Sequence, residues 1–363
     1  MRRLFMNLKL LKEYTDAAAP AGFEKEAFEV MKNHISPHSD DITKDNLGSL
    51  IALKKGNGEN LPKVMLAGHL DEIGFMITKI DDNGFLKFQP LGGWWGQVML
   101  SQKMEIVNSE GKRFIAVIGS KPPHTLSETD KTKPMSIDNM YLDMGVGSKK
   151  EVEELGIVIG DFVVPYCEFS QMANKKYLLA KAWDNRIGCY FVGEVFKRTK
   201  KEDLNVDLYG VGTVQEEVGC RGAKTTANKI NPDLGIAIDV GLAGDIPGYE
   251  NETFQSKLGM GPLITLYDRG MIAHRGLRDY VINTAKENSI NFQYAGLNGG
   301  STDGSAIHVA HDGAPTLYVG LATRYIHSNV SVIHYDDIES TIELLVQLIL
   351  KLNEESVSEI TYK

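Results

Sequence analysis

The stretch KVMLAGHLDEIGF, residues 63–75, combines a predicted strand with two polar residues that follow it. Its first half, KVMLAG (63–68), is a short apolar run typical of a strand that is buried on both faces of a sheet. His69 and Asp71 follow this run directly. Polar residues placed just after a buried strand lie at its carboxyl end, where α/β sheets form their sites. The stretch therefore predicts a helix-covered sheet with a site at one edge.

Strand and helix patterns alternate on both sides of this stretch. Leu4, Leu8 and Leu11 are spaced for one face of a helix near the N-terminus. Alternation of this kind predicts an α/β fold with a parallel or mixed sheet flanked by helices. The expected strands are 177–183, 206–214, 234–240 and 314–321, and the expected helices are 25–35, 186–198, 222–230, 276–288 and 338–353.

Residues 73–164 have a different, β-rich character. Apolar runs flank the turns DNG (82–84) and SEG (109–111), and each arrangement is typical of a hairpin. VEELGIVIGDFVVP (152–165) is expected to close the region with a strand and a turn. Many short strands joined by tight turns predict a small barrel, and KPPHTLSETDKTKP (121–134) an exposed loop. We therefore expect a discontinuous domain of residues 1–72 and 165–363, interrupted by an inserted β-barrel at 73–164.

Composition and charge narrow the class of protein. The chain carries 39 basic and 48 acidic residues, for a net charge of -9, and this mild acidity argues against a nucleic-acid surface. No apolar run approaches the roughly 20 residues that span a bilayer, and the N-terminal segment is expected to be a helix rather than a signal peptide. Three cysteines without a CxxC pair indicate reduced thiols, so we expect a cytoplasmic protein. From the charge and the lack of a long apolar run, we expect neither nucleic-acid nor membrane partners.

Histidines and carboxylates lie at, or just after, the ends of five separate predicted strands. Taken singly, each is most simply a helix cap or a solvated loop residue. Together they bring two histidines and five carboxylates to one sheet edge, a set that suits zinc, cobalt or manganese. Two such ions about 3.5–4 Å apart would need a shared carboxylate. The residues are His69, Asp71, Asp184, Glu216, Glu217, Asp239 and His327.

Four of these residues suggest particular roles. Asp184 could be the shared carboxylate. Asp71 could accept the second ring N–H of His69 and so fix its tautomer, or it could be a helix cap with no metal nearby. Adjacent carboxylates in an extended chain point to opposite sides, so of Glu216 and Glu217 one could bind metal while the other acts as a base. An exposed acidic turn is the alternative for this pair.

Five motifs carry a resemblance to a known family. The chain resembles the tetrahedral and glutamyl aminopeptidases, cocatalytic metallopeptidases of which some have borne the name cellulase or endoglucanase. The resemblance runs in order from about residue 60 to 340. The motifs are AGHLDEIGF (67–75), AWDNRIG (182–188), VQEEVGCRGA (214–223), IAIDVG (236–241) and RYIHS (324–328).

The resemblance implies a fold, a reaction and an assembly. The fold would be a zinc-exopeptidase-like mixed sheet with an inserted PDZ-like β-barrel for dimerisation. The reaction would be removal of N-terminal residues from peptides with two divalent ions, zinc or cobalt and alternatively manganese. The chains would form tetrahedral dodecamers built from dimers. His69 and Asp239 would hold one ion, Glu217 and His327 the other, with Asp184 bridging, Glu216 as general base and Asp71 orienting His69.

Several alternatives stay open. A metal-free scaffold of the same fold would not need the intact ligand set, and a glycoside hydrolase would use two carboxylates and leave the histidines without a purpose. Asp303 is expected to hydrogen-bond backbone near the site, and Trp94 and Trp95 to lie in the barrel core. Arg269 could attract an acidic substrate side chain or form an ordinary salt bridge. The preferred N-terminal residue is left undecided.

Overall fold

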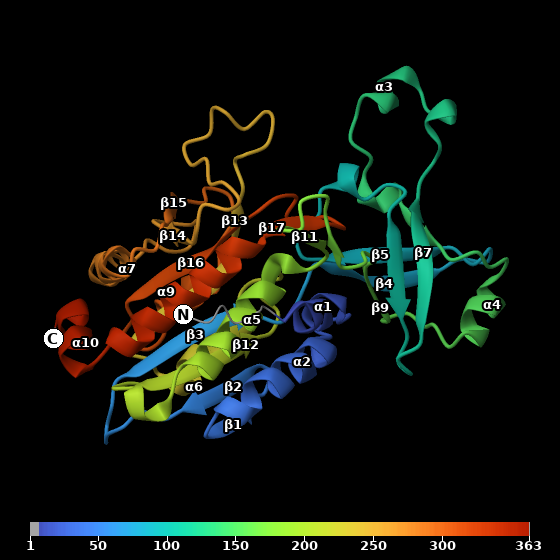
Figure 1. Cartoon of the computed structure of the whole chain (residues 1–363). Helices are drawn as coiled ribbons and strands as arrows, with labels where there is room; N and C mark the ends of the chain where they lie inside the picture. Colours follow the sequence, from blue (N-terminus) through green and yellow to red (C-terminus); the bar gives the residue numbers. More distant parts are fainter. Residues whose placement is uncertain (1–6, 363) are drawn as a thin grey trace.

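The chain forms two bodies, a helix-covered sheet and a β-barrel beside it (Figure 1). The computed structural model describes residues 7–362. Within this range no helix has both the length and the apolar character needed to cross a bilayer.

The main sheet has eight strands and is mixed. Its centre, β12-β3-β13-β16, is parallel, whereas β2 and β14 run antiparallel to the central strands beside them. The α/β fold class is thereby confirmed. In spatial order the strands are β1 (Asp41–Lys44), β2 (Leu50–Lys54), β12 (Asp207–Thr213), β3 (Lys63–His69), β13 (Leu234–Leu242), β16 (Thr316–Thr323), β14 (Leu263–Thr265) and β15 (Gln293–Ala295).

One predicted strand lies outside the main sheet. The segment 177–183 yields β11 (Tyr177–Ala180), which lies in a separate small sheet with β10 (Ser170–Gln171) and β17 (Ser331–His334). Its apolar pattern is that of a buried strand, but the pattern does not state which partner the strand pairs with. Asp184 therefore reaches the sheet edge from the start of a helix and not from a strand of the main sheet.

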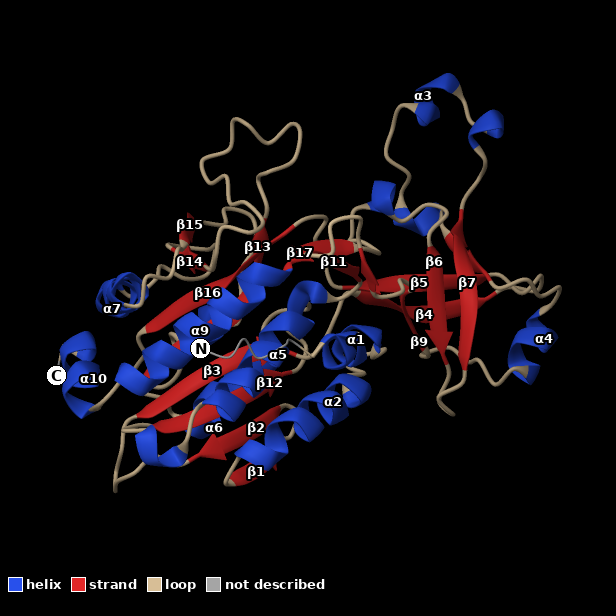
Figure 2. Cartoon of the chain, viewed as in Figure 1, coloured by secondary structure: helices blue, strands red, loops and turns tan. Residues whose placement is uncertain are grey.

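Helices cover both faces of the sheet (Figure 2). Val64 and Leu66 of β3 pack into the large core with α1, α2, α5 and α9, while Met65 and Ala67 face the smaller core beside α6. The predicted helices are present. The first begins at Leu8, after its N-cap Asn7, and Leu4 lies outside the described residues. The helices are α1 (Leu8–Asp16), α2 (Lys25–Ile35), α5 (Trp183–Arg198), α6 (Arg221–Ile230), α7 (Arg275–Glu287), α8 (Gly304–Ile307), α9 (Tyr335–Lys351) and α10 (Glu354–Thr361).

Close contact between β3 and α5 positions the site. A Cβ at Gly68 would lie 2.7 Å from the Gly188 carbonyl carbon and 2.8 Å from the Cys189 amide nitrogen. Only glycine permits this approach. It places His69, the last residue of β3, against the start of the helix that carries Asp184.

The inserted body is a closed barrel of six antiparallel strands. Both predicted hairpins are present as β4–β5 and β6–β7. The last predicted segment contains part of helix α4 (Lys149–Glu154) before its strand. The segment between β7 and β8 carries the short helix α3 (Glu128–Lys131) and stands away from the barrel (Figure 1). The strands are β4 (Gly74–Ile80), β5 (Leu86–Leu91), β6 (Lys103–Val107), β7 (Arg113–Gly119), β8 (Tyr141–Asp143) and β9 (Phe162–Pro165).

The two tryptophans of the barrel have different environments. Trp94 stacks on Phe75 with ring centroids 4.7 Å apart and packs against the barrel core. Trp95 is 60% exposed, so the prediction that it lies in the core is wrong. Consecutive extended residues point to opposite sides, and only one of the pair can face inward.

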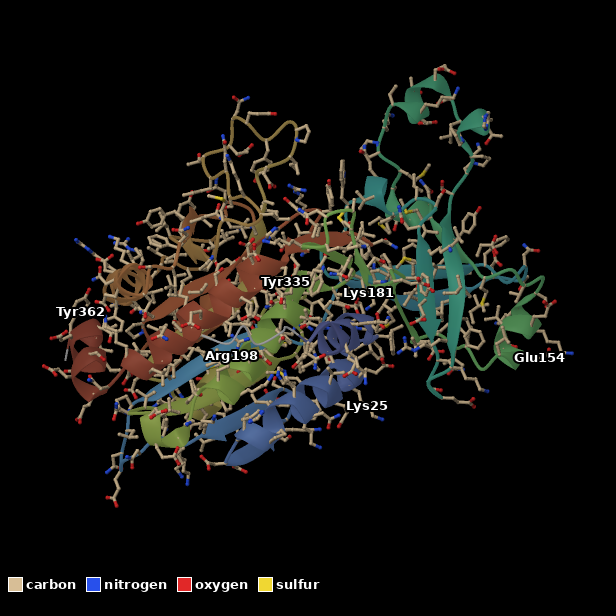
Figure 3. The ribbon with its side chains drawn as sticks, viewed as in Figure 1. Lys25, Glu154, Lys181, Arg198, Tyr335 and Tyr362 are labelled. Carbon is tan, nitrogen blue, oxygen red and sulfur yellow. The ribbon has the colours of Figure 1, made fainter. Side chains whose placement is uncertain are left out.

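A buried ionic cluster joins the N-terminal segment to the start of α5. The Glu72 carboxylate accepts hydrogen bonds from Lys181 Nζ at 2.6 and 2.7 Å and from Arg186 Nη2 at 3.1 Å. All three residues are buried, and Figure 3 shows Lys181 near the junction of the two bodies. The Arg186 guanidinium also donates to the backbone carbonyls of Tyr14 and Ala17. The cluster thus holds residues 181–186, which include Asp184, in place.

Replacing Glu72 should destabilise the fold. Glu72→Gln would leave two buried cations without their counter-charge, and we expect the free energy of unfolding to fall by about 3–5 kcal/mol. Urea-induced unfolding measures this change. The matched control is Asp336→Asn, which removes the partner of Lys176 from an exposed pair and should cost about 1 kcal/mol or less. Equal losses for the two variants would contradict the assignment.

Candidate metal centre

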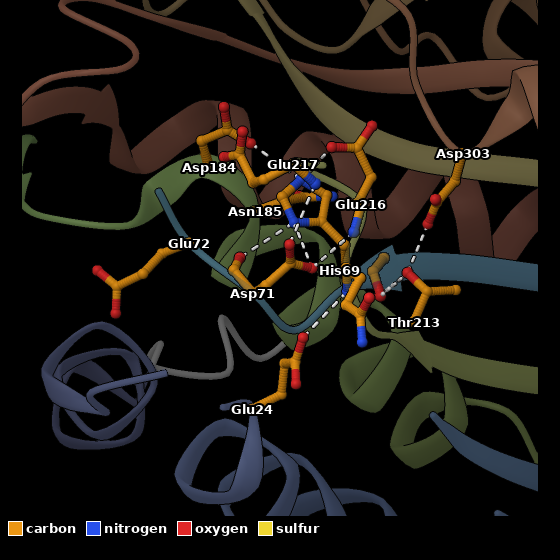
Figure 4. A network of polar contacts seen from close by, with 12 residues as sticks. Glu24, His69, Asp71, Glu72, Asp184, Asn185, Thr213, Glu216, Glu217 and Asp303 are labelled. Atoms are coloured by element: carbon orange, nitrogen blue, oxygen red, sulfur yellow. Dashed lines mark hydrogen bonds and ion pairs between the residues drawn. The ribbon is translucent and has the colours of Figure 1, made fainter. Parts of the chain in front are cut away.

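The predicted ligands come together at the carboxyl end of the central strands. His69 ends β3, Asp239 lies in β13, and Asp184 lies in the first turn of α5. Glu216 and Glu217 occupy the turn between β12 and α6, and His327 lies between β16 and β17. Figure 4 shows most of these side chains converging from different elements.

The carboxylate of Asp184 stands between two imidazoles. Its Oδ1 is 3.1 Å from His69 Nε2, and its Oδ2 is 3.2 Å from His327 Nε2. Each oxygen therefore serves one histidine. This is the arrangement expected of a carboxylate shared by two neighbouring metal ions.

The ligand atoms fall into two groups that share Asp184. In each group every ligand atom lies within 4.8 Å of the others. Three ligands that leave further positions open are typical of catalytic metal sites. The first group is His69, Asp184 and Asp239, and the second is Asp184, Glu217 and His327.

The electrostatics of the cluster fit bound cations. Glu217 Oε1 is buried and has no hydrogen-bond partner. Burial, together with the neighbouring Asp184 carboxylate, raises the pKa of Glu217 to about 8. Burial and Asp184 also raise the pKa of Asp239 well above its usual value. Carboxylates crowded in this way are unfavourable unless positive charge compensates them, so the residues present suit a pair of divalent ions.

Both histidines present the same ring nitrogen to the cluster. His69 Nδ1 is 3.0 Å from the backbone carbonyl of Asp71, and His327 Nδ1 is 2.9 Å from the carbonyl of Gly93. A carbonyl only accepts, so Nδ1 must carry the proton in both rings. Nε2 is thereby left with its lone pair free for a metal.

The contact made by Gly93 shows that the barrel completes the site. Gly93 follows β5, whereas His327 belongs to the other body. A Cβ at Gly93 would lie 3.1 Å from His327 Nδ1, so a larger residue would crowd the ring. His327 itself has a φ of 56°, and its side chain is 39% exposed. The position of this histidine therefore depends on how the barrel sits.

Asp71 has a different contact from the predicted one. Its carboxylate is 3.7 Å from His69 Nδ1, farther than its own backbone carbonyl. The carboxylate instead accepts the backbone N–H of Glu216 at 3.0 Å and of Glu217 at 3.1 Å. A buried carboxylate that receives two N–H groups holds the acidic turn rigidly.

Glu216 belongs to neither ligand group that contains Asp184. Its Oε2 is 3.8 Å from His69 Nε2, and its Oε1 is 3.4 Å from Cys220 Sγ. Glu216 and Glu217 thus serve different groups, as expected for adjacent residues. Burial, opposed by the nearby His69, raises the pKa of Glu216 well above its usual value. The carboxylate can consequently hold a proton beside the ligands.

No sequence motif marks Glu24, a buried residue that contacts the turn carrying Glu216. Glu24 Oε1 accepts the Gln215 backbone N–H at 3.1 Å, and burial raises the pKa of Glu24 to about 7. Its position just before α2 marks it only as a helix cap. Cys220 and Asp303 form a third close group with Glu216. Asp303 accepts from the Thr213 hydroxyl at 2.5 Å and not from backbone as predicted, because β12 places that hydroxyl beside it.

A cavity of about 710 Å³ opens beside these ligands. Asp184, Glu216, Glu217, Asp239 and His327 contribute to its lining. The remaining walls come from the segments around β13, β14, β15 and β16. The site is therefore a pocket in which a substrate can reach the paired ligand groups.

Comparison with known proteins agrees with the predicted resemblance. Residues 48–344 match the M42 glutamyl aminopeptidase family. The chain is 35% identical to the glutamyl aminopeptidase of Lactococcus lactis, over 96% of this chain and 98% of that protein. It is 38% identical to the TET aminopeptidase of a marine sediment Thaumarchaeota archaeon, with a TM-score of 0.93 and coverage of 97% and 99%.

A third relative is similar over almost its full length. The TET1 peptidase of Pyrococcus horikoshii, described as assembling into a tetrahedron or a large octahedral shell, is 32% identical with a TM-score of 0.83. The match covers 95% of this chain and 99% of that one. With the geometry above, these similarities show that the chain belongs to the M42 glutamyl aminopeptidase family of peptide hydrolases.

Proposed function

We propose that this chain is an aminopeptidase that removes N-terminal residues from peptides at a centre of two divalent metal ions. The main support for this proposal is the Asp184 carboxylate, whose two oxygens each face the Nε2 of a different histidine. The M42 peptidases are metallopeptidases, and membership of that family supports the same conclusion.

The ligand assignment follows from the two groups that share Asp184. His69 and Asp239 would hold one ion, and Glu217 and His327 the other. Imidazole and carboxylate together suit zinc or cobalt, with manganese as a further candidate. When bound, such ions supply Lewis acidity to the scissile carbonyl and lower the pKa of water at the site.

Glu216 is proposed as the general base. Its carboxylate lines the cavity and lies outside both ligand groups that contain Asp184, so it remains available to the substrate. It would take the proton of the attacking water and pass it to the leaving amine. Asp71 is a positioning residue, because its carboxylate fixes the backbone of both Glu216 and Glu217.

The domain arrangement and assembly are also proposals. Residues 1–72 and 165–363 would act as the catalytic domain, with 73–164 as a dimerisation domain. The shells named for the Pyrococcus horikoshii relative support a homo-oligomer, with a tetrahedral dodecamer built from dimers as the expected form. The three cysteines are free thiols in the structure, which supports a reducing, cytoplasmic location.

Hydrolysis of aminoacyl-anilides tests the activity. We expect hydrolysis that a chelator abolishes and that added zinc or cobalt restores, because water activation needs the ions. Peptides with a blocked N-terminus should resist cleavage. An absence of hydrolysis while both ions are demonstrably bound would favour the non-catalytic scaffold.

Removing the shared ligand tests the metal centre. Asp184→Ala takes a ligand from both groups, so the affinity should fall by more than the roughly 10–100-fold cost of losing an outer-shell partner. Elemental analysis after dialysis against limiting zinc measures the bound metal. Glu252→Ala is the control, because Glu252 lines the same cavity outside both groups. Unchanged metal content in Asp184→Ala would contradict the assignment of Asp184 as the shared metal ligand.

Replacing the general base separates catalysis from metal binding. Glu216→Gln should lower kcat by about 10²–10⁴-fold, because proton transfer is lost while the metal ligands remain. Steady-state kinetics and metal analysis are measured on the same preparation. Glu250→Gln, an exposed glutamate beyond the cavity lining, should leave both unchanged. Near-normal turnover in Glu216→Gln would assign the base to another group.

A further inference from the structure

The cavity beside the metal ligands extends away from them under a long loop. Residues 243–262 join β13 to β14 and form the yellow-orange loop that stands above the sheet in Figure 1. Tyr249, Glu252 and Phe254 of this loop line the cavity. The far part of the cavity is thus bounded in part by this loop, in addition to residues near β13, β15 and β16.

Apart from Glu252, the wall of this far part combines large apolar side chains with smaller uncharged polar ones. Leu242 lies three residues beyond Asp239 at the end of β13 and is 39% exposed. Phe254 packs edge-to-face on Tyr267 with ring centroids 6.2 Å apart. Side chains of this kind favour an apolar ligand group, since its transfer from water is favourable. The larger apolar side chains lining the cavity are Leu242, Tyr249, Phe254, Leu297, Tyr318 and Ile326.

Apart from His327, the acidic and basic residues that line the cavity are all aspartates and glutamates. Asp184, Glu216, Glu217 and Asp239 lie at the ligand end, and Glu252 lies in the loop. No lysine or arginine lines the cavity among residues 7–362. His327 faces Asp184 and Glu217 through its Nε2.

Nearby arginines offer no counter-charge. Arg324 is held by Asp245 through two contacts of 2.9 and 2.7 Å. Arg269, which the sequence left open as a partner for acidic substrates, is exposed and is not part of the cavity lining. An acidic substrate side chain in this part of the cavity, away from the metal ions, would therefore be desolvated without a lysine or arginine to pair with.

We infer that the pocket accepts an uncharged apolar N-terminal side chain, such as leucine, methionine or phenylalanine, and rejects an acidic one. This inference rests on the proposed aminopeptidase function and deepens it. It sets the chain apart from the glutamyl preference that names its family. Leu242 and Phe254 are the residues that determine this preference, and Glu252 adds to the exclusion of acidic side chains.

The primary test ranks substrates with the full-length, metal-loaded protein. Leucyl, phenylalanyl, glutamyl and lysyl anilides are compared by kcat/KM. We expect the leucyl or phenylalanyl substrate to exceed the glutamyl one on the order of a hundredfold, because a carboxylate would be buried unpaired. A glutamyl or lysyl substrate in first place would overturn the inference and leave the aminopeptidase proposal standing. No hydrolysis of any substrate would count against that proposal instead.

An arginine introduced into the cavity wall tests whether Leu242 contacts the first side chain of the substrate. Leu242→Arg should raise the ratio of glutamyl to leucyl kcat/KM on the order of a hundredfold, because the guanidinium pairs with the substrate carboxylate. Val309→Arg is the matched control, since Val309 is 63% exposed and lies outside the cavity lining. Metal analysis checks that the centre is intact.

A second variant keeps the test decisive if the first does not fold. Glu252→Arg reverses the charge of an exposed loop residue and should shift the ratio in the same direction. An unchanged ratio in a folded, metal-loaded variant at either position would show that these side chains do not face the substrate's first residue. That result would overturn the inference.

Discussion

The shared carboxylate of Asp184 is the interaction on which the rest of the site depends. Its two oxygens face two imidazoles that arrive from different parts of the chain, one at the end of β3 and one between β16 and β17. Three features hold this geometry. The contact at Gly68 brings β3 against α5, the Glu72 cluster fixes the start of that helix, and the barrel supplies the carbonyl that orients His327. A change in any of them would act on the chemistry without touching a ligand.

The site needs these structural contacts because its carboxylates are crowded together and repel one another. Asp184, Glu217 and Asp239 lie together with Glu216 and Asp71 at one sheet edge, and burial raises the pKa of most of these groups. The apo cluster is therefore unfavourable, and bound cations would stabilise the fold as well as activate water. Backbone N–H groups donated to Asp71 offset part of the repulsion and hold the acidic turn rigid before any metal arrives.

Periodicity and strand ends in the sequence predicted the features that they determine. The buried run 63–68 and the residues at the ends of the other strands predicted the α/β fold and a set of candidate ligands at one sheet edge. The sequence did not predict the features that depend on which atoms meet across the fold. The pairing of β11, the carbonyl contact made by Asp71, the hydroxyl partner of Asp303 and the exposure of Trp95 are of this kind. The support that Gly93 gives to His327 links residues 234 positions apart, and no local pattern encodes it.

The residues proposed for the reaction and the residues that set substrate preference lie in different kinds of structure. The proposed ligands His69, Glu217 and Asp239 lie, with Glu216, at strand ends and in the turn after β12, where the sheet fixes their positions. Relatives at 35% and 38% identity match almost the whole chain. Part of the cavity wall comes instead from the loop of residues 243–262, which the sheet constrains far less. A family name describes the reaction that the strand ends support. The preferred residue follows from the charges and apolar side chains that line the cavity, where Leu242 at the end of β13 and Phe254 and Glu252 in the loop offer an acidic side chain no partner.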